Sequence, residues 1–86
     1  AIELDPLDPL IYRNRATRKI DLEDYDGAIL DLNKAIEITP NDPVAYFIRS
    51  FAKGLSGMSD SACDDLAKAS ELGFKDAEEA LKEYCG

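Results

Sequence analysis

Acidic residues crowd the segment from Asp21 to Gly27, where their spacing invites comparison with a calcium-binding loop. Such a loop places oxygen ligands at alternate positions, a glycine at position 6 and a bidentate glutamate at position 12. When Gly27 is aligned with that glycine, Leu22 falls on the first ligand position and Asn33 falls where the glutamate belongs. The segment lacks both anchoring ligands, so no metal site is expected.

The residue types also give little indication of a catalytic or zinc site. The sequence contains no histidine and only two cysteines, which removes the imidazole general base and leaves too few thiolates for a structural zinc site. Carboxylates are plentiful, but the acidic run of Asp60, Asp64 and Asp65 is expected on a solvated helix face, where nothing would shift pKa values apart. We therefore expect neither an enzyme nor a cofactor.

The charge of the chain restricts its partners. The net charge is -8, and charged residues make up 33% of the sequence. Nucleic-acid binding depends on clustered Lys and Arg, so no nucleic-acid partner is expected and basic partners are favoured over acidic ones. No apolar stretch approaches the roughly 18 residues of a membrane span, so membrane insertion is not expected.

An internal repeat determines the architecture. Residues 9–42 align without a gap on residues 43–76, with 12 identities in 34 positions. The matched pairs include Tyr12 with Tyr46, Arg15 with Arg49, Lys19 with Lys53, Ala28 with Ala62, Leu32 with Leu66 and Ala35 with Ala69. They recur at spacings of three and four within two blocks, which predicts two helices per repeat. Residues 1–6 also match residues 35–40, so the chain is expected to begin inside an earlier repeat.

Start and stop signals divide the chain into five expected helices. Asp8-Pro9, Asp24 and Asp42-Pro43 are helix starts, and Gly73 is a left-handed stop. The expected helices run from 9 to about 21, 25 to about 38, 43 to about 55, 59 or 60 to about 72, and 77 to 84, the last opened by Asp76. In their core, Tyr12, Ala16, Ala28, Leu32 and Ala35 are expected to pack with Tyr46 and Ala62 across the repeat boundary. The last helix, with Ala77, Ala80, Leu81 and Tyr84 inward, is expected to cap the stack.

The pattern Tyr12-x-x-Arg15-Ala16-x-x-Lys19, then Ala28-x-x-x-Leu32, then Pro40 resembles the tetratricopeptide repeat. The resemblance implies an all-α fold, a right-handed superhelical stack of antiparallel helix pairs forming an α-solenoid. It divides the single domain 1–86 into the end of a preceding repeat (1–8), a full repeat (9–42), a degenerate repeat (43–75) and a capping helix (76–86). The second copy departs from the pattern, since Phe74 stands where the proline belongs.

Arg15 and Arg49 stand where the family has a leucine. We expect each to bury its aliphatic stem and expose its head, and a ligand contact is the alternative.

The resemblance also implies where a ligand would lie, because the first helix of each pair lines the concave face in this family. The candidate peptide-binding residues are Leu10, Arg13, Asn14 and Thr17 in the first copy, and Val44, Phe47, Ile48, Phe51 and Leu55 in the second. Arg13 and Asn14 are similar to part of the clamp by which some members bind a terminal carboxylate, but the apolar second set favours leucine or aromatic side chains of a peptide. The alternative is that this second set is buried within the chain or against another copy.

A protein-interaction scaffold that binds a peptide segment of another protein is the function these features favour. A self-association module that dimerises or extends a longer array is the alternative, and a homo-oligomer is compatible with it. A third possibility is that the array is an appendage of a catalytic protein.

Cys63 and Cys85 lie at equal distances along the chain from Phe74, one before it and one after it, and Phe74 is in the expected turn between the last two helices. An antiparallel hairpin folded there brings equidistant residues together, so their sulfurs are predicted to be close enough to bond. Two buried free thiols are the alternative. A cytoplasmic location follows if the cysteines are free, and a periplasmic or extracellular one if they are bonded.

Overall fold

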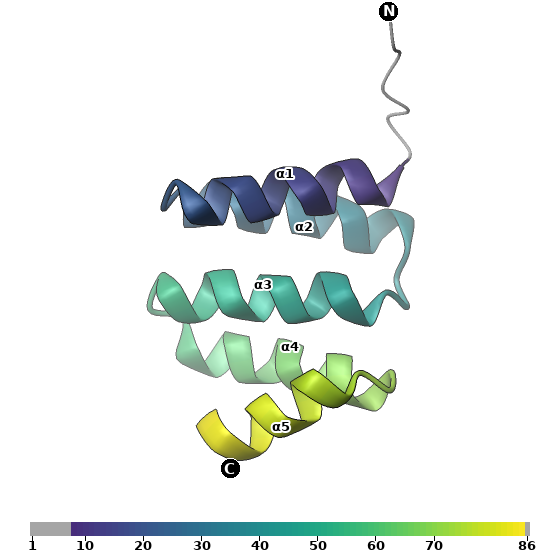
Figure 1. Cartoon of the computed structure of the whole chain (residues 1–86), viewed down its shortest axis with the longest axis vertical. Coiled ribbons are helices and arrows are strands. Elements are labelled where there is room, and N and C mark those ends of the chain that lie inside the picture. The colour runs from purple at the N-terminus through teal and green to yellow at the C-terminus, as the bar shows by residue number, and fades with distance from the viewer. Residues whose placement is uncertain (1–7, 86) are drawn as a thin grey trace, which may run out of the picture.

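Five helices form two antiparallel pairs and a final single helix in the computed structural model, which describes residues 8–85 (Figure 1). They are α1 (Pro9–Asp21), α2 (Tyr25–Ile38), α3 (Pro43–Leu55), α4 (Ser59–Glu71) and α5 (Lys75–Tyr84). No strand occurs within the described residues. The predicted all-α fold is confirmed. The part of a preceding repeat expected in residues 1–8 lies almost wholly outside the described residues.

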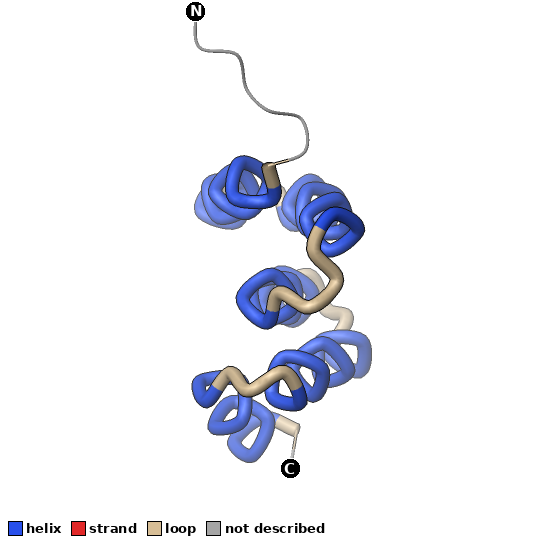
Figure 2. Tube along the Cα trace, turned by 90° about the vertical axis from the view of Figure 1, so that its right-hand side faces the viewer, coloured by secondary structure: helices blue, strands red, loops and turns tan. Residues whose placement is uncertain are grey.

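The pairs stack so that like helices lie in the same layer. Figure 2 shows α1 and α3 on one side of the stack, with α2 and α4 on the other. Helix α5 follows α4 and packs against it at the end of the stack. The odd-numbered helices therefore present one continuous face, which faces the viewer in Figure 1.

Aspartate caps start the first three helices where the sequence predicts them. The side chains of Asp8, Asp24 and Asp42 accept hydrogen bonds from the backbone N–H groups of Leu10, Gly27 and Val44, respectively. These bonds satisfy donors that have no partner inside the helix. The acidic segment that resembles a calcium loop thus supplies a helix cap.

The start of α5 differs from the prediction. Phe74, rather than Asp76, is the N-cap residue, and its carbonyl accepts from the N–H groups of Ala77 and Glu78. The Phe74 ring packs edge-to-face on Phe47, with ring centroids 5.0 Å apart. This aromatic contact fixes the chain at Phe74, so the helix begins directly after it, at Lys75, before Asp76 is reached.

Three helices end in the same left-handed turn. After α1, α3 and α4, the residues at positive φ are Glu23 (62°), Gly57 (94°) and Gly73 (98°). In each turn the next N–H donates back to a carbonyl of the helix, as in the bond from Asp24 N–H to the Lys19 carbonyl. Glycine adopts this conformation without a steric cost, but Glu23 does not.

The core is built largely from alanine. One cluster joins both layers of the first pair to α3, through Ala16, Ala28, Leu32, Ala35, Ala45 and Ala52. Such small residues let helices approach closely. The prediction that Tyr46 and Ala62 complete this cluster is wrong: Tyr46 packs in a second cluster with Leu66, Ala69 and Ala77. Ala45 and Ala52 of α3 make the contact with the first repeat instead. They lie on a different face of α3 from Tyr46, which packs in the second cluster.

Candidate functional site

A buried aspartate in each repeat binds a bidentate arginine. In the first repeat, Arg15 Nε lies 3.0 Å from Asp31 Oδ2 and Arg15 Nη2 lies 2.7 Å from Oδ1. Lys19 Nζ lies 3.0 Å from the same Oδ2. The Arg15 guanidinium also lies over the Tyr12 ring, 5.6 Å from its centroid. We call these four residues the first Arg–Asp cluster.

The second Arg–Asp cluster repeats this geometry in the second copy, with Tyr46, Arg49, Lys53 and Asp65. Arg49 donates to both Asp65 oxygens, at 2.8 Å from Nε and 2.7 Å from Nη2, and Lys53 Nζ lies 3.0 Å from Oδ2. Arg49 Nη1 additionally donates to the Asn33 side-chain oxygen at 2.8 Å, which links the second repeat to the first. The Arg49 side chain is accordingly 18% exposed, against 53% for Arg15.

These clusters correct the expectation for Asp65 and the expectation that the head of Arg49 is exposed, since the Arg49 side chain is only 18% exposed. The sequence predicts Asp65 on a solvated face, but it is buried, and Asp31 is buried in the same way. Burial would raise the pKa of Asp31, yet hydrogen bonds from Arg15 and Lys19, with their positive charges, outweigh it and lower the pKa. The hydrogen bond to Asp65 likewise raises the pKa of Arg49, against its partial desolvation. Both arginine heads therefore hold the fold together, and neither needs an external ligand.

Arg13, the basic member of the candidate set on α1, is engaged within the chain. Arg13 Nη1 lies 3.2 Å from Asp42 Oδ2, an ion pair that ties α1 to the start of α3. Thr17 donates its hydroxyl to the Arg13 carbonyl, while Leu10 and Asn14 are exposed. The basic group of this set thus already has a carboxylate partner within the chain.

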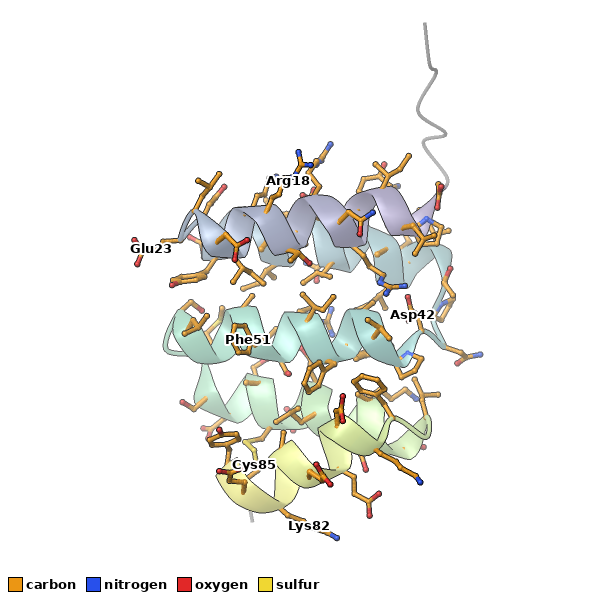
Figure 3. The ribbon with its side chains drawn as sticks, viewed as in Figure 1. Arg18, Glu23, Asp42, Phe51, Lys82 and Cys85 are labelled. Carbon is orange, nitrogen blue, oxygen red and sulfur yellow. A yellow bond between two sulfur atoms is a disulfide. The ribbon has the colours of Figure 1, made fainter. Side chains whose placement is uncertain are left out.

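The apolar set on α3 divides into packed and exposed members. Ile48 packs against the first core cluster, and Phe47 packs in the second cluster beside Phe74. Val44 is half-buried. Phe51 and Leu55, one and two turns further along, remain exposed, Phe51 to 56%. Figure 3 shows Phe51 on the face formed by the odd-numbered helices.

Two grooves run along α3 and meet at its aromatic residues. The larger, of about 560 Å³, lies between α3, α4 and α5, and the smaller, of about 270 Å³, lies between α1 and α3. Phe47 and Phe51 line both. The larger groove is also lined by Leu55, Ala62, Leu66, Ala80, Tyr84 and the two cysteines, and the smaller by Thr17, Ile20, Asp21 and Ile48. We call these lining residues together the aromatic surface.

The contribution of α5 to this surface differs from the sequence pattern. Helical spacing puts Tyr84 on the inward stripe with Ala77 and Ala80, but it is 75% exposed and lines the larger groove. Tyr84 is the last residue of α5, and its ring lies at the mouth of the groove instead of packing with Ala77 in the second core cluster. Leu10, Arg13, Asn14 and Val44, in contrast, line neither groove.

A disulfide joins α4 to the end of α5 beside the larger groove. The structure bonds Cys63 to Cys85, with Cα atoms 5.9 Å apart, within the usual range for disulfides. Both cysteines line the groove, so the bond holds α5 as one of its walls.

The described part of the chain also bears on two other classes of site. Among residues 8–85, no three His, Cys, Asp or Glu side chains converge in a way that could hold a metal ion. In the same range no helix has the length and apolar character required to cross a membrane.

No protein-family model matches the chain. The chain is, however, 33% identical over 82 residues to small glutamine-rich tetratricopeptide repeat-containing protein 2 of Saccharomyces cerevisiae. The match covers 95% of this chain and 24% of the yeast protein, so the chain spans about a quarter of the length of that relative. With two helix pairs in register and a fifth helix at the end, the chain has the fold of a tetratricopeptide-type helical repeat solenoid.

Proposed function

We propose that the chain is a non-catalytic protein-interaction scaffold that belongs to the tetratricopeptide repeat family and binds a peptide segment of a partner on its aromatic surface. The similarity to a tetratricopeptide repeat-containing protein supports an interaction module in general. In the proposed division, residues 9–42 and 43–75 are the two repeats and residues 76–86 are the cap.

The observation that carries the proposal is the exposure of Phe51 between two grooves. A large apolar side chain exposed beside apolar concavities contributes little to the stability of the isolated chain. Binding of a partner would remove it from water, at about 25 cal/mol for each Å² of apolar surface covered. Phe51 is also an aromatic anchor at the centre of the surface, a position typical of residues that dominate binding energy.

Selection of peptides from a displayed library, followed by variants of single exposed residues, would test the proposal. Phe51→Ser should remove binding of the selected peptides, because it deletes the exposed one of the two aromatic side chains that line both grooves. Leu30→Ser is the matched control, since Leu30 is 68% exposed on α2 and lines neither groove. Both variants should melt like the parent chain. Peptides that bind Phe51→Ser unchanged would contradict this site.

Phe47 is unsuitable for this test. Its ring packs on Phe74 in the second core cluster, so Phe47→Ser would remove a core contact as well as a groove wall. Loss of a fully buried aromatic side chain costs about 3 to 5 kcal/mol, and loss of the half-buried Phe47 ring would cost part of that, so weaker binding would not distinguish a lost groove wall from a weakened fold.

Self-association through the same surface is the alternative function. The exposed Phe51 favours it as much as it favours a foreign peptide, but two copies would each carry a net charge of -8. Sedimentation velocity over a range of protein concentrations would separate the two: a concentration-dependent dimer that Phe51→Ser abolishes would establish self-association.

We further propose that the chain resides in an oxidising compartment, periplasmic or extracellular. The Cys63–Cys85 disulfide supports this, since such bonds persist outside the reducing cytosol. Counting thiols under denaturing conditions, on protein purified without reductant, is the check. Two free thiols would contradict it.

A further inference from the structure

The charges around the aromatic surface restrict the chemistry of its occupant. No Lys or Arg lines either groove, whereas Asp21 lines the smaller one beside Phe51 and Ile48. Asp21 is exposed and has no ion-pair partner among residues 8–85. An unpaired carboxylate therefore stands at the edge of an apolar groove.

The basic residues nearest to this surface are already engaged or point elsewhere. Lys53 and Arg49 of α3 bind Asp65, and Lys19 of α1 binds Asp31. Figure 3 places Arg18 on the side of α1 away from α3. Among residues 8–85, no cation of α1 or α3 therefore forms an ion pair with Asp21.

Asp21 lies at the end of the stack where the odd-numbered helices end and the even-numbered helices begin. Helices α1, α3 and α5 all end on the left in Figure 1, where Asp21, Leu55 and Tyr84 lie in or next to their last turns. The partial negative charges of these C-terminal ends are offset by the partial positive charges of the N-terminal ends of α2 and α4, which begin at the same end, so the Asp21 carboxylate itself is the local negative charge.

We propose that the occupant of the aromatic surface is a basic segment of another protein, with an apolar anchor on each side of Phe51 and a Lys or Arg beside Asp21. This inference rests on the proposed function and specifies its partner. A volume of about 560 Å³ falls within the range of pockets that enclose small ligands, so the larger groove accommodates a bulky side chain. The smaller groove takes the second anchor. A second copy of this acidic chain, or an acidic peptide, would bring negative charge against the negatively charged chain and its Asp21 carboxylate.

Selections from a display library with equal numbers of acidic and basic residues, using the parent chain and two charge variants, test this inference. The parent chain should enrich peptides with two apolar residues and neighbouring Lys or Arg. Asp21→Lys should lose the basic enrichment, while Asp64→Lys should keep it. Asp64 is the matched control because it is exposed on α4 and lines neither groove.

Fluorescence anisotropy with one selected basic peptide gives the magnitude. Reversing the charge at Asp21 should weaken binding about three- to tenfold at low salt, and less at high salt, whereas Asp64→Lys should change it less than twofold.

The outcomes separate this inference from the function on which it rests. Peptides that depend on Phe51 but show no preference for basic residues would overturn the basic partner and leave the peptide-binding function standing. An enrichment of acidic peptides would do the same. If no selected peptide depends on Phe51, both fail.

Discussion

Arg49 and Asp65 form a two-point contact in which both carboxylate oxygens accept hydrogen bonds, at 2.8 Å and 2.7 Å. The carboxylate comes from α4 and the guanidinium from α3, so the contact holds the second helix pair together. Because Asp65 is buried, its charge depends on Arg49 and Lys53 for stabilisation. Removing the arginine would leave the buried Asp65 carboxylate with Lys53 as its remaining cationic partner among the described residues.

Arg49→Ala should therefore lower the free energy of unfolding by about 2 to 3 kcal/mol, less than when a buried charge loses every partner, because Lys53 still pairs with Asp65. Arg15→Ala should cost clearly less, because Arg15 is more exposed and lacks the bond that Arg49 makes to Asn33. Urea unfolding of both variants checks the order. Equal losses would mean that the difference in burial has no energetic consequence.

Acid should weaken the first Arg–Asp cluster in a defined direction. The pKa of Asp31 is lower in the folded chain than in the unfolded one, so the unfolded state binds more protons as the pH falls below the unfolded value of about 3.9. The stabilisation is complete above that value and is lost as the pH falls through the folded pKa. Asp31→Asn should flatten the loss of stability in this acid range. Urea midpoints measured from neutral pH down to strongly acidic pH provide the check, with the exposed Asp64→Asn as control.

The alanine core leaves no room at the crossing of the first two helices. Ala28 is fully buried in the first cluster, so Ala28→Leu should overpack it and cost about 1 to 3 kcal/mol. Leu30→Ala, further along the same helix and exposed, should change stability by less than about 0.5 kcal/mol. Thermal melts of the pair test the register of α2, and an unchanged melting temperature for Ala28→Leu would show that register to be wrong.

Glu23 and Gly57 occupy equivalent left-handed positions in the two repeats, but only glycine adopts this conformation freely. Glu23→Gly should therefore stabilise the chain by about 1 kcal/mol, and Gly57→Ala should destabilise it by a similar amount. No heavy atom beyond the adjacent residues lies within 4 Å of a Cβ built at Gly57, so the loss would report backbone conformation alone. A destabilising Glu23→Gly would contradict this account.

Reduction of the disulfide should affect α5 more than the rest of the stack. The bond joins cysteines separated by 22 positions in the sequence, and a loop of this size contributes about 3 kcal/mol in the chain-entropy model. The Cys63→Ser, Cys85→Ser double variant should melt at a lower temperature than the oxidised chain. Reductant should lower the melting temperature of the parent chain but not that of the double variant. On reduction of the parent chain, the largest increase in amide hydrogen-exchange rate should occur in α5. A reductant effect on the double variant would show that another process is responsible.

Sequence patterns predict the helices well because their signals are local. Asp8, Asp24 and Asp42 each cap a helix within a few residues, and the spacing of Ala28, Leu32 and Ala35 marks one buried stripe. These features need no knowledge of distant contacts.

The residues that sequence patterns misplace depend on neighbours from other helices. Asp65 resembles any exposed acidic residue until Arg49 is set beside it, although its identity with Asp31 at the repeat spacing is an available signal. Similarly, one stripe on α3 divides into packed and exposed members because Phe74 reaches Phe47 but not Phe51. Periodicity finds a face of a helix, but it does not identify what covers that face.

The two Arg–Asp clusters also have a consequence for how such a chain grows by duplication. All four members of a cluster lie within a single repeat unit, from Tyr12 to Asp31 in one copy and from Tyr46 to Asp65 in the other. Duplication of the gene segment for one unit therefore copies a complete Arg–Asp cluster between its two helices. The neighbouring repeats need no compensating substitutions. The disulfide has no counterpart in the first unit, so duplication of that unit would not propagate it. A duplicated unit thus inherits its own ion pairs because each Arg–Asp cluster lies within one unit.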